Sequence, residues 1–69
     1  MNTAQVYSSS VKSVGFDSDI GDLQIDFQSG RSYLYADVPE TVYENLMESD
    51  SIGTFVNDKI KPKYNYTEI

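Results

Sequence analysis

The sequence predicts one small α+β domain: a three-stranded antiparallel β-meander covered by one amphipathic α-helix and a short C-terminal helical turn. Its length of 69 residues is enough for a single domain. Residues 11–38 contain three β-prone runs separated by turn-forming residues, and residues 39–49 have the periodicity of a helix. A chain this short buries about 60% of its unfolded surface, so we expect a thin core without a deep pocket.

The first two strands are expected at residues 11–16 and 23–28. The second alternates apolar with polar residues, which is typical of a strand with one buried face. The loop between them, DSDIGD at 17–22, is rich in turn formers. Short loops on both sides of the second strand indicate antiparallel pairing, and residues 32–38 supply the third strand.

The turn before the third strand decides which way Tyr33 and Tyr35 face. A two-residue loop at 29–30 would expose both rings, where they could stack on nucleotide bases. A three-residue loop at 28–30 would place both rings on the core face. We favour the longer loop because it requires a positive φ only at Gly30, and we then expect the hydroxyls to reach water at the rim of the sheet.

The segment PETVYENLMES at residues 39–49 predicts the covering helix. Its apolar residues fall within an arc of about 140° at 100° per residue. They are Val42, Tyr43, Leu46 and Met47. Beyond the helix, residues 54–60 predict one short helical turn, which ends before Pro62.

The helix also carries a row of like charges, Glu40, Glu44 and Glu48, at a spacing of four residues. Each neighbouring pair costs an isolated helix about 0.2–0.5 kcal/mol. The row is therefore either a solvated face or a surface for a basic protein partner. Together with Leu34, expected on the outer face of the sheet, these glutamates are our candidate partner-binding residues.

Charge is unevenly distributed along the chain. Eleven acidic residues against five basic ones give a net charge of -6, which opposes nucleic acid at long range and favours basic partners. Residues 58–69 differ, because they interleave lysines with tyrosines as a single-strand binder would. The candidate residues for this alternative nucleic-acid site are Tyr33, Tyr35, Lys59, Lys61, Lys63 and Tyr64.

Composition argues against several classes of function. The chain has no cysteine and no histidine, so it has no disulfide, no thiolate or imidazole metal ligand and no histidine acid–base chemistry. The loop at 17–22 has Asp22 where a calcium loop needs glycine, and Gln28 where it needs glutamate. We therefore expect no metal, no cofactor and no catalysis. The N-terminal residues lack a signal-peptide pattern and no apolar run could span a bilayer, so we expect a cytoplasmic protein.

A longer pattern resembles the KTSC domain. Its most specific part is Tyr33 and Tyr35 followed by VP at 38–39. The other matching residues are Ser8, Ser9, Val11, VGF at 14–16, Leu23, Ile25, Phe27, SG at 29–30, Val42, Tyr43, Leu46, SIG at 51–53, Phe55, Asn57, Ile60 and Tyr64. Phe16 stands where the family usually has tyrosine, and a small apolar residue is absent before Ser51.

The resemblance implies a stand-alone bacterial or phage member of the family, with one domain over residues 1–69 and a flexible or flanking segment at 1–7. The family is named after the C-terminal extension of certain lysyl-tRNA synthetases. That context suggests RNA binding, although the family's function is unknown and it supplies no catalytic residues. We expect a non-catalytic module that binds a protein, with nucleic-acid binding as the alternative. Inhibition by charge mimicry, as in phage-type acidic inhibitors, and homodimerisation stay open.

Overall fold

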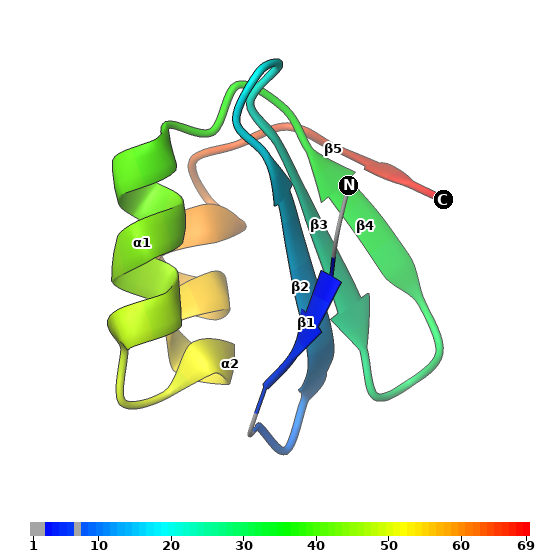
Figure 1. Cartoon of the computed structure of the whole chain (residues 1–69). Coiled ribbons are helices and arrows are strands. Elements are labelled where there is room, and N and C mark those ends of the chain that lie inside the picture. The colour runs from blue at the N-terminus through cyan, green and yellow to red at the C-terminus, as the bar shows by residue number, and fades with distance from the viewer. Residues whose placement is uncertain (1–2, 7) are drawn as a thin grey trace.

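A computed structural model describes residues 3–6 and 8–69 of the chain. Five strands and three helical segments follow one another (Figure 1). In order they are β1 (Thr3–Gln5), β2 (Val11–Asp17), β3 (Asp22–Phe27), β4 (Ser32–Tyr35), α1 (Glu40–Glu48), α2 (Ile52–Phe55), the π-helical turn η1 (Val56–Ile60) and β5 (Tyr66–Glu68).

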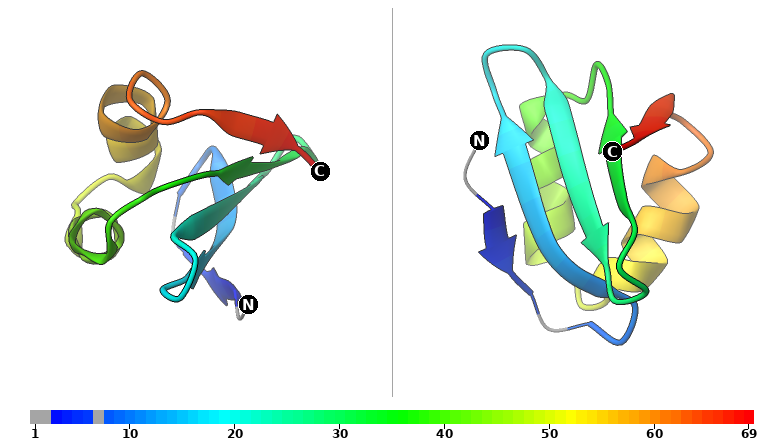
Figure 2. Two further views of the ribbon diagram at one scale, coloured as in Figure 1. Left: turned by 90° about the horizontal axis from the view of Figure 1, so that it is seen from above. Right: turned by 90° about the vertical axis from the view of Figure 1, so that its right-hand side faces the viewer.

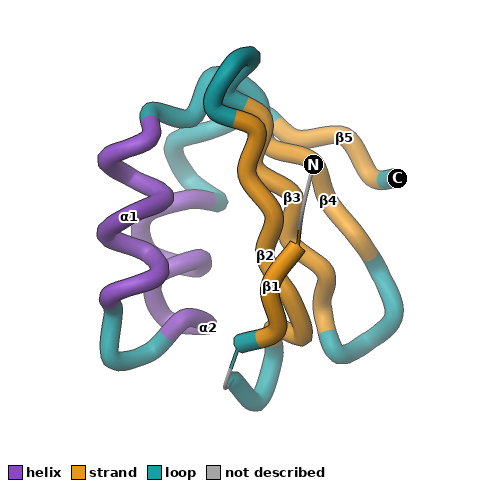
Figure 3. The backbone as a smooth tube through the Cα atoms, in the orientation of Figure 1, coloured by secondary structure: helices purple, strands orange, loops and turns teal. Residues whose placement is uncertain are grey.

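The strands form one antiparallel sheet in the order β1-β2-β3-β4-β5. The helical segments all cover the same face of this sheet, as the view from above shows (Figure 2). The opposite face carries no helix, so the molecule has two layers (Figure 3). The α+β class with an antiparallel sheet is therefore confirmed.

The predicted number of strands was wrong. β2, β3 and β4 form the expected meander, but β1 and β5 extend it at the two edges. Residues 3–5, which the sequence assigned to a flanking segment, form β1, whereas residues 1, 2 and 7 lie outside the described part of the chain. Each added strand has only three residues, which is too short for a period of two to be recognised.

The predicted three-residue turn is confirmed. Gly30 has a φ of 94°, and its N–H donates to the carbonyl oxygen of Phe27 at 3.0 Å. Tyr33 lies opposite Ile25 and Tyr35 opposite Leu23. Both rings therefore share the helix-covered face with the alternating apolar residues of β3.

The core lies between the sheet and the helical segments. Leu46 of α1, Ile52 of α2 and Ile60 of η1 reach it from the helical layer. Its buried residues are Val11, Val14, Leu23, Ile25, Tyr35, Val38, Leu46, Ile52, Val56 and Ile60. The C-terminal helical segment is longer than the single turn predicted, because α2 begins at residue 52, where the Ser51 hydroxyl accepts a hydrogen bond from the N–H of Thr54 at 3.3 Å.

None of the helices in the described part of the chain has both the length and the apolar character needed to cross a membrane.

Candidate functional site

The acidic row lies on the exposed side of α1, as predicted. Glu40, Glu44 and Glu48 are all exposed, while Leu46 on the other side of the helix is fully buried. Successive members of the row are about 6 Å apart along the helix axis, at 1.5 Å per residue. Half-buried Met47 borders the row and adds apolar surface beside the carboxylates.

None of these three glutamates has a lysine or arginine nitrogen within 4 Å among the described residues. The one ion pair found there joins Arg31 to Glu68 at 3.8 Å, in another part of the molecule. α1 also has no basic residue in its last turn, where a cation would be favoured by the helix dipole. No direct ion pair within the described residues therefore neutralises the row.

Tyr33 and Tyr35 do not form an open stacking platform. Tyr35 is fully buried and Tyr33 is half-buried. Burial raises the pKa of Tyr35 above its ordinary value, and the neighbouring hydroxyls of Tyr66 and Tyr33 act in the same direction. Their rings instead support a third ring, Tyr66, whose centroid lies 4.8 Å from that of Tyr33 and 5.6 Å from that of Tyr35.

Tyr66 is the exposed member of this aromatic cluster, with 57% of its surface accessible. The sequence placed it near the lysines but gave no reason to prefer it to Tyr33 or Tyr35. Its position follows from the pairing of Tyr66 with Tyr35 across β4 and β5, and a three-residue strand carries no pattern that predicts this pairing.

Two of the three candidate lysines join the tyrosines. Lys61 places its ammonium 5.2 Å from the centre of the Phe27 ring, a cation–π contact. A shallow hollow of about 490 Å³ lies beside Tyr66. Its lining residues are Lys61, Pro62, Lys63, Tyr64, Asn65 and Tyr66, so Lys59 is not among them. We call these six residues the lysine–tyrosine end.

The outer face of the sheet is polar around Asp26, and Leu34 is only half-exposed on β4. In register with Leu34 lie Gln24 and Thr67 on the neighbouring strands. Leu34 is therefore flanked by polar residues on both sides, which differs from the exposed apolar patch that a partner contact through this residue would use.

Asp26 accepts hydrogen bonds from the side chains of Ser13 at 2.5 Å, Ser32 at 2.7 Å and Gln24 at 2.9 Å. Burial by itself would raise the pKa of this carboxyl. The hydrogen bonds and the positive charge of Lys12 outweigh burial and lower the pKa below its ordinary value. Asp26 is thus an ionised group whose hydrogen-bonding capacity is largely used within the sheet.

The described residues contain no group of three or more Asp, Glu, His or Cys side chains able to hold a metal ion together. The turn at 17–22 instead uses its aspartate locally, because Asp17 accepts a hydrogen bond from the N–H of Asp19 at 3.0 Å. This is an Asx-type turn contact.

Comparisons of the sequence and of the structure with known proteins point to the same family. The sequence model of the KTSC domain matches residues 7–64. An uncharacterized protein of Stutzerimonas stutzeri strain A1501 is 39% identical over 70 residues, covering 100% of this chain and 99% of the relative. A protein of Tsukamurella paurometabola is 37% identical over 59 residues, covering 86% of this chain and 88% of the relative.

A solved structure shares the fold. The crystal structure of a KTSC domain protein from Yersinia pestis superimposes with a TM-score of 0.93 at 36% identity. The match covers 99% of this chain and 96% of that protein. The similarity therefore extends over the edge strands β1 and β5 as well as the central meander.

Proposed function

This chain belongs to the KTSC domain family, and from that premise we propose that it is a small non-catalytic module that binds a basic segment of a protein partner through the acidic row of α1. The observation that carries the proposal is the set of three exposed carboxylates without a direct ion pair in the described structure. A basic helix with lysine or arginine every four residues has the same axial spacing as the row.

Two physical effects support this assignment. A row of like charges raises the free energy of the helix, and bringing cations to it removes that repulsion. Met47 lies next to the row and offers apolar surface to the aliphatic stems of lysine or arginine. The negative far field of the whole chain also speeds the encounter with a basic partner.

The test is capture of partners from a host lysate with wild type and the double variant Glu44→Lys with Glu48→Lys. A matched control, Asp19→Lys with Asp58→Lys, changes the net charge equally at exposed positions outside the row. We expect a protein retained by wild type and by the control to be lost with the row variant, while thermal melts stay similar. Equal retention by all three proteins would contradict the proposal.

A second candidate function, binding of single-stranded nucleic acid, is favoured by the lysine–tyrosine end. There an exposed ring, Tyr66, lies beside a hollow lined by Lys61 and Lys63. Stacking of a base on an aromatic ring is worth about 1–3 kcal/mol, and phosphate contacts from lysine make binding sensitive to salt.

Fluorescence anisotropy of labelled single-stranded RNA at two salt concentrations tests this candidate. We expect affinity to fall with salt and to be weakened both by Tyr66→Ala and by Lys61→Ala with Lys63→Ala. Lys59→Ala is the matched control, because Lys59 lies outside the hollow. Binding that is equally sensitive to the Lys59 change would reflect general charge and would exclude a site at this end.

A further inference from the structure

The β2 strand contains an extra residue that changes which side chains reach the outer face of the sheet. Val11 and Val14 are both fully buried although they are three residues apart. A regular strand would place them on opposite faces. The pairing shifts between Val11, opposite Phe27, and Ser13, opposite Asp26, so Lys12 is the additional residue of a β-bulge.

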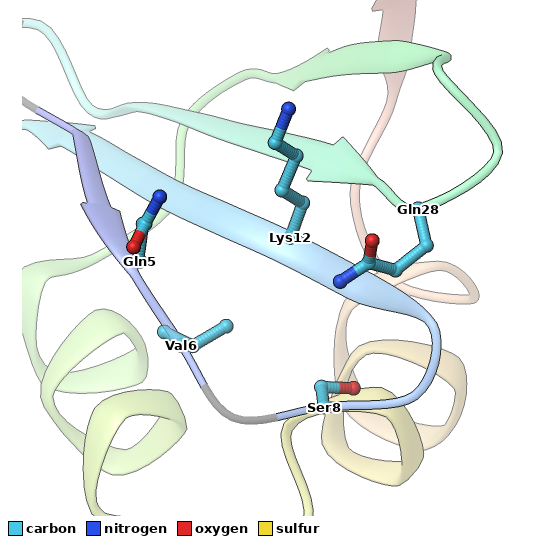
Figure 4. Close-up of a pocket in the computed structure, with 5 residues that line it drawn as sticks. All are labelled: Gln5, Val6, Ser8, Lys12 and Gln28. Carbon is cyan, nitrogen blue, oxygen red and sulfur yellow. The ribbon is translucent and has the colours of Figure 1, made fainter.

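The bulge places Lys12 between two hollows. The larger, of about 660 Å³, is lined by Gln5, Val6, Ser8, Lys12 and Gln28 (Figure 4). The smaller, of about 300 Å³, is lined by Lys12, Ser13, Asp26, Phe27, Gly30 and Ser32. Because Lys12 belongs to both linings, the two hollows adjoin at this side chain. We call the pair the Lys12 groove.

The ammonium group of Lys12 has no carboxylate within 4 Å among the described side chains, where the single ion pair is that of Arg31 and Glu68. Lys12 acts electrostatically on Asp26, whose two oxygens already accept three hydrogen bonds from Ser13, Gln24 and Ser32. Lys12 is also exposed. Its ammonium group is therefore accessible to an anionic ligand, and we expect the anion in the larger hollow, because the ionised Asp26 lines the smaller one.

The other described residues that line the larger hollow include neutral hydrogen-bonding groups. Figure 4 shows the carboxamides of Gln5 and Gln28 on either side of Lys12, with the Ser8 hydroxyl and the apolar Val6 below them. A carboxamide donates through its nitrogen and accepts through its oxygen, so it can bond a hydroxyl group in either sense. Gln28 is weakly held, since its nitrogen lies 3.5 Å from the carbonyl oxygen of Val11.

We propose that the Lys12 groove binds a small hydroxylated anion of the sugar-phosphate or sugar-acid class. Lys12 pairs with the phosphate or carboxylate group, while Gln5 and Gln28 bond the ligand's hydroxyls. The larger hollow lies at the β1–β2 border of the sheet, where Val6 packs against the core and Ser8 lies near α2. The groove shares no lining residue with the acidic row of α1 or with the lysine–tyrosine end. It therefore adds a ligand to the proposed partner-binding function and does not depend on it.

Titration of the ¹⁵N-labelled chain, followed by amide chemical shifts at fixed ionic strength, tests the proposal. The probes are glucose 6-phosphate, gluconate, inorganic phosphate and glucose. We expect saturable shifts at Lys12, Ser13 and Gln28 with glucose 6-phosphate or gluconate, and weaker binding of both inorganic phosphate and glucose. The stronger of the two hydroxylated anions identifies the charged group that the site prefers.

Lys12→Met keeps the aliphatic stem and removes the charge. Because the ligand then loses its charge-assisted contact, this variant should bind about tenfold more weakly or worse. Gln28→Leu should reduce the preference for glucose 6-phosphate over inorganic phosphate. Lys59→Met, an exposed lysine outside the groove, is the control and should bind as wild type does.

Three results would overturn the proposal. They are an absence of saturable shifts with both hydroxylated anions, binding unchanged by Lys12→Met, and shifts centred on the lysine–tyrosine end instead of the groove. The shift map also reports whether each variant is folded, so loss of binding through unfolding is recognised directly.

Discussion

The acidic row of α1 and the lysine–tyrosine end of the chain are built in opposite ways. The row has charge without aromatic rings, and its glutamates project from a helix whose buried side is held by Leu46. The lysine–tyrosine end joins its cations to an exposed ring, Tyr66, that rests on the sheet through Tyr33 and Tyr35. The net charge of -6 has the sign of the acidic row and not that of the lysine–tyrosine end, so each surface suits a different class of partner.

The largest effect is expected when the buried ring beneath the lysine–tyrosine end is removed. Tyr35→Ala deletes a fully buried aromatic side chain and should cost about 3–5 kcal/mol. This is comparable to the whole net stability expected of a domain this small, so the variant should be largely unfolded. Urea denaturation measures the loss.

Tyr66→Ala serves as the control for Tyr35→Ala, because Tyr66 is exposed and its removal should leave the urea midpoint close to that of wild type. A Tyr35→Ala protein as stable as wild type would mean that the aromatic cluster is not anchored in the core.

The two charged surfaces can also be set against Asp26, an acidic group satisfied inside the sheet. Its pKa is lowered on folding, so its ionised form stabilises the native state above the unfolded value of 3.8, and this contribution is lost as pH falls through the lower folded pKa. Asp26→Asn should lower stability by on the order of 1 kcal/mol near neutral pH.

Urea denaturation of wild type and Asp26→Asn at several pH values measures this effect. The difference between them should shrink as pH falls below 3.8. A difference that is constant down to strongly acidic pH would show that ionisation of Asp26 is not what stabilises the fold.

The acidic row is expected to be kept at a cost in stability. Glu48→Lys places a cation in the last turn of α1 and pairs it with Glu44 one turn earlier. Both changes are favourable, and together they should raise stability by about 0.5–1 kcal/mol at low salt. Thermal or urea unfolding with and without added salt measures the gain.

Glu40→Lys provides the comparison for Glu48→Lys. Glu40 lies in the first turn, where the helix dipole favours an anion, so reversal of its charge should gain less. If Glu48→Lys lowers stability, the row is supported by interactions that charge repulsion and the dipole do not describe.

The smallest expected effect is at the edge of the lysine–tyrosine end. Arg31 and Glu68 form an ion pair of 3.8 Å whose side chains are 65% and 52% exposed. Glu68→Gln should therefore change stability by less than about 0.5 kcal/mol. A larger loss by urea denaturation would mean that this ion pair contributes more to the stability of the fold than an exposed pair normally does.

Sequence alone predicted those parts of the fold that have a local signal. The alternation of Leu23, Ile25 and Phe27 identified β3, and the positive φ available to Gly30 gave the correct face for the tyrosines. Strands β1 and β5 were missed because three residues carry no alternation, and their pairing is decided by contacts distant in sequence.

The same distinction holds for the candidate surfaces. The spacing of Glu40, Glu44 and Glu48 was enough to place them on the exposed side of α1. The role of Tyr66 depends on its register with Tyr35. The Lys12 groove depends on the bulge in β2, which is recognised from the register shift and from the burial of both Val11 and Val14. Such features need the assembled sheet.

The shortness of the outermost strands has a consequence for how copies of this chain meet. An exposed strand offers unpaired backbone groups that can template the growth of a fibril. Among the described residues, β1 and β5 each span only three residues, so these two strands offer few such groups to an incoming chain. Short edge strands of this kind are one way in which sheet proteins discourage amyloid-like stacking.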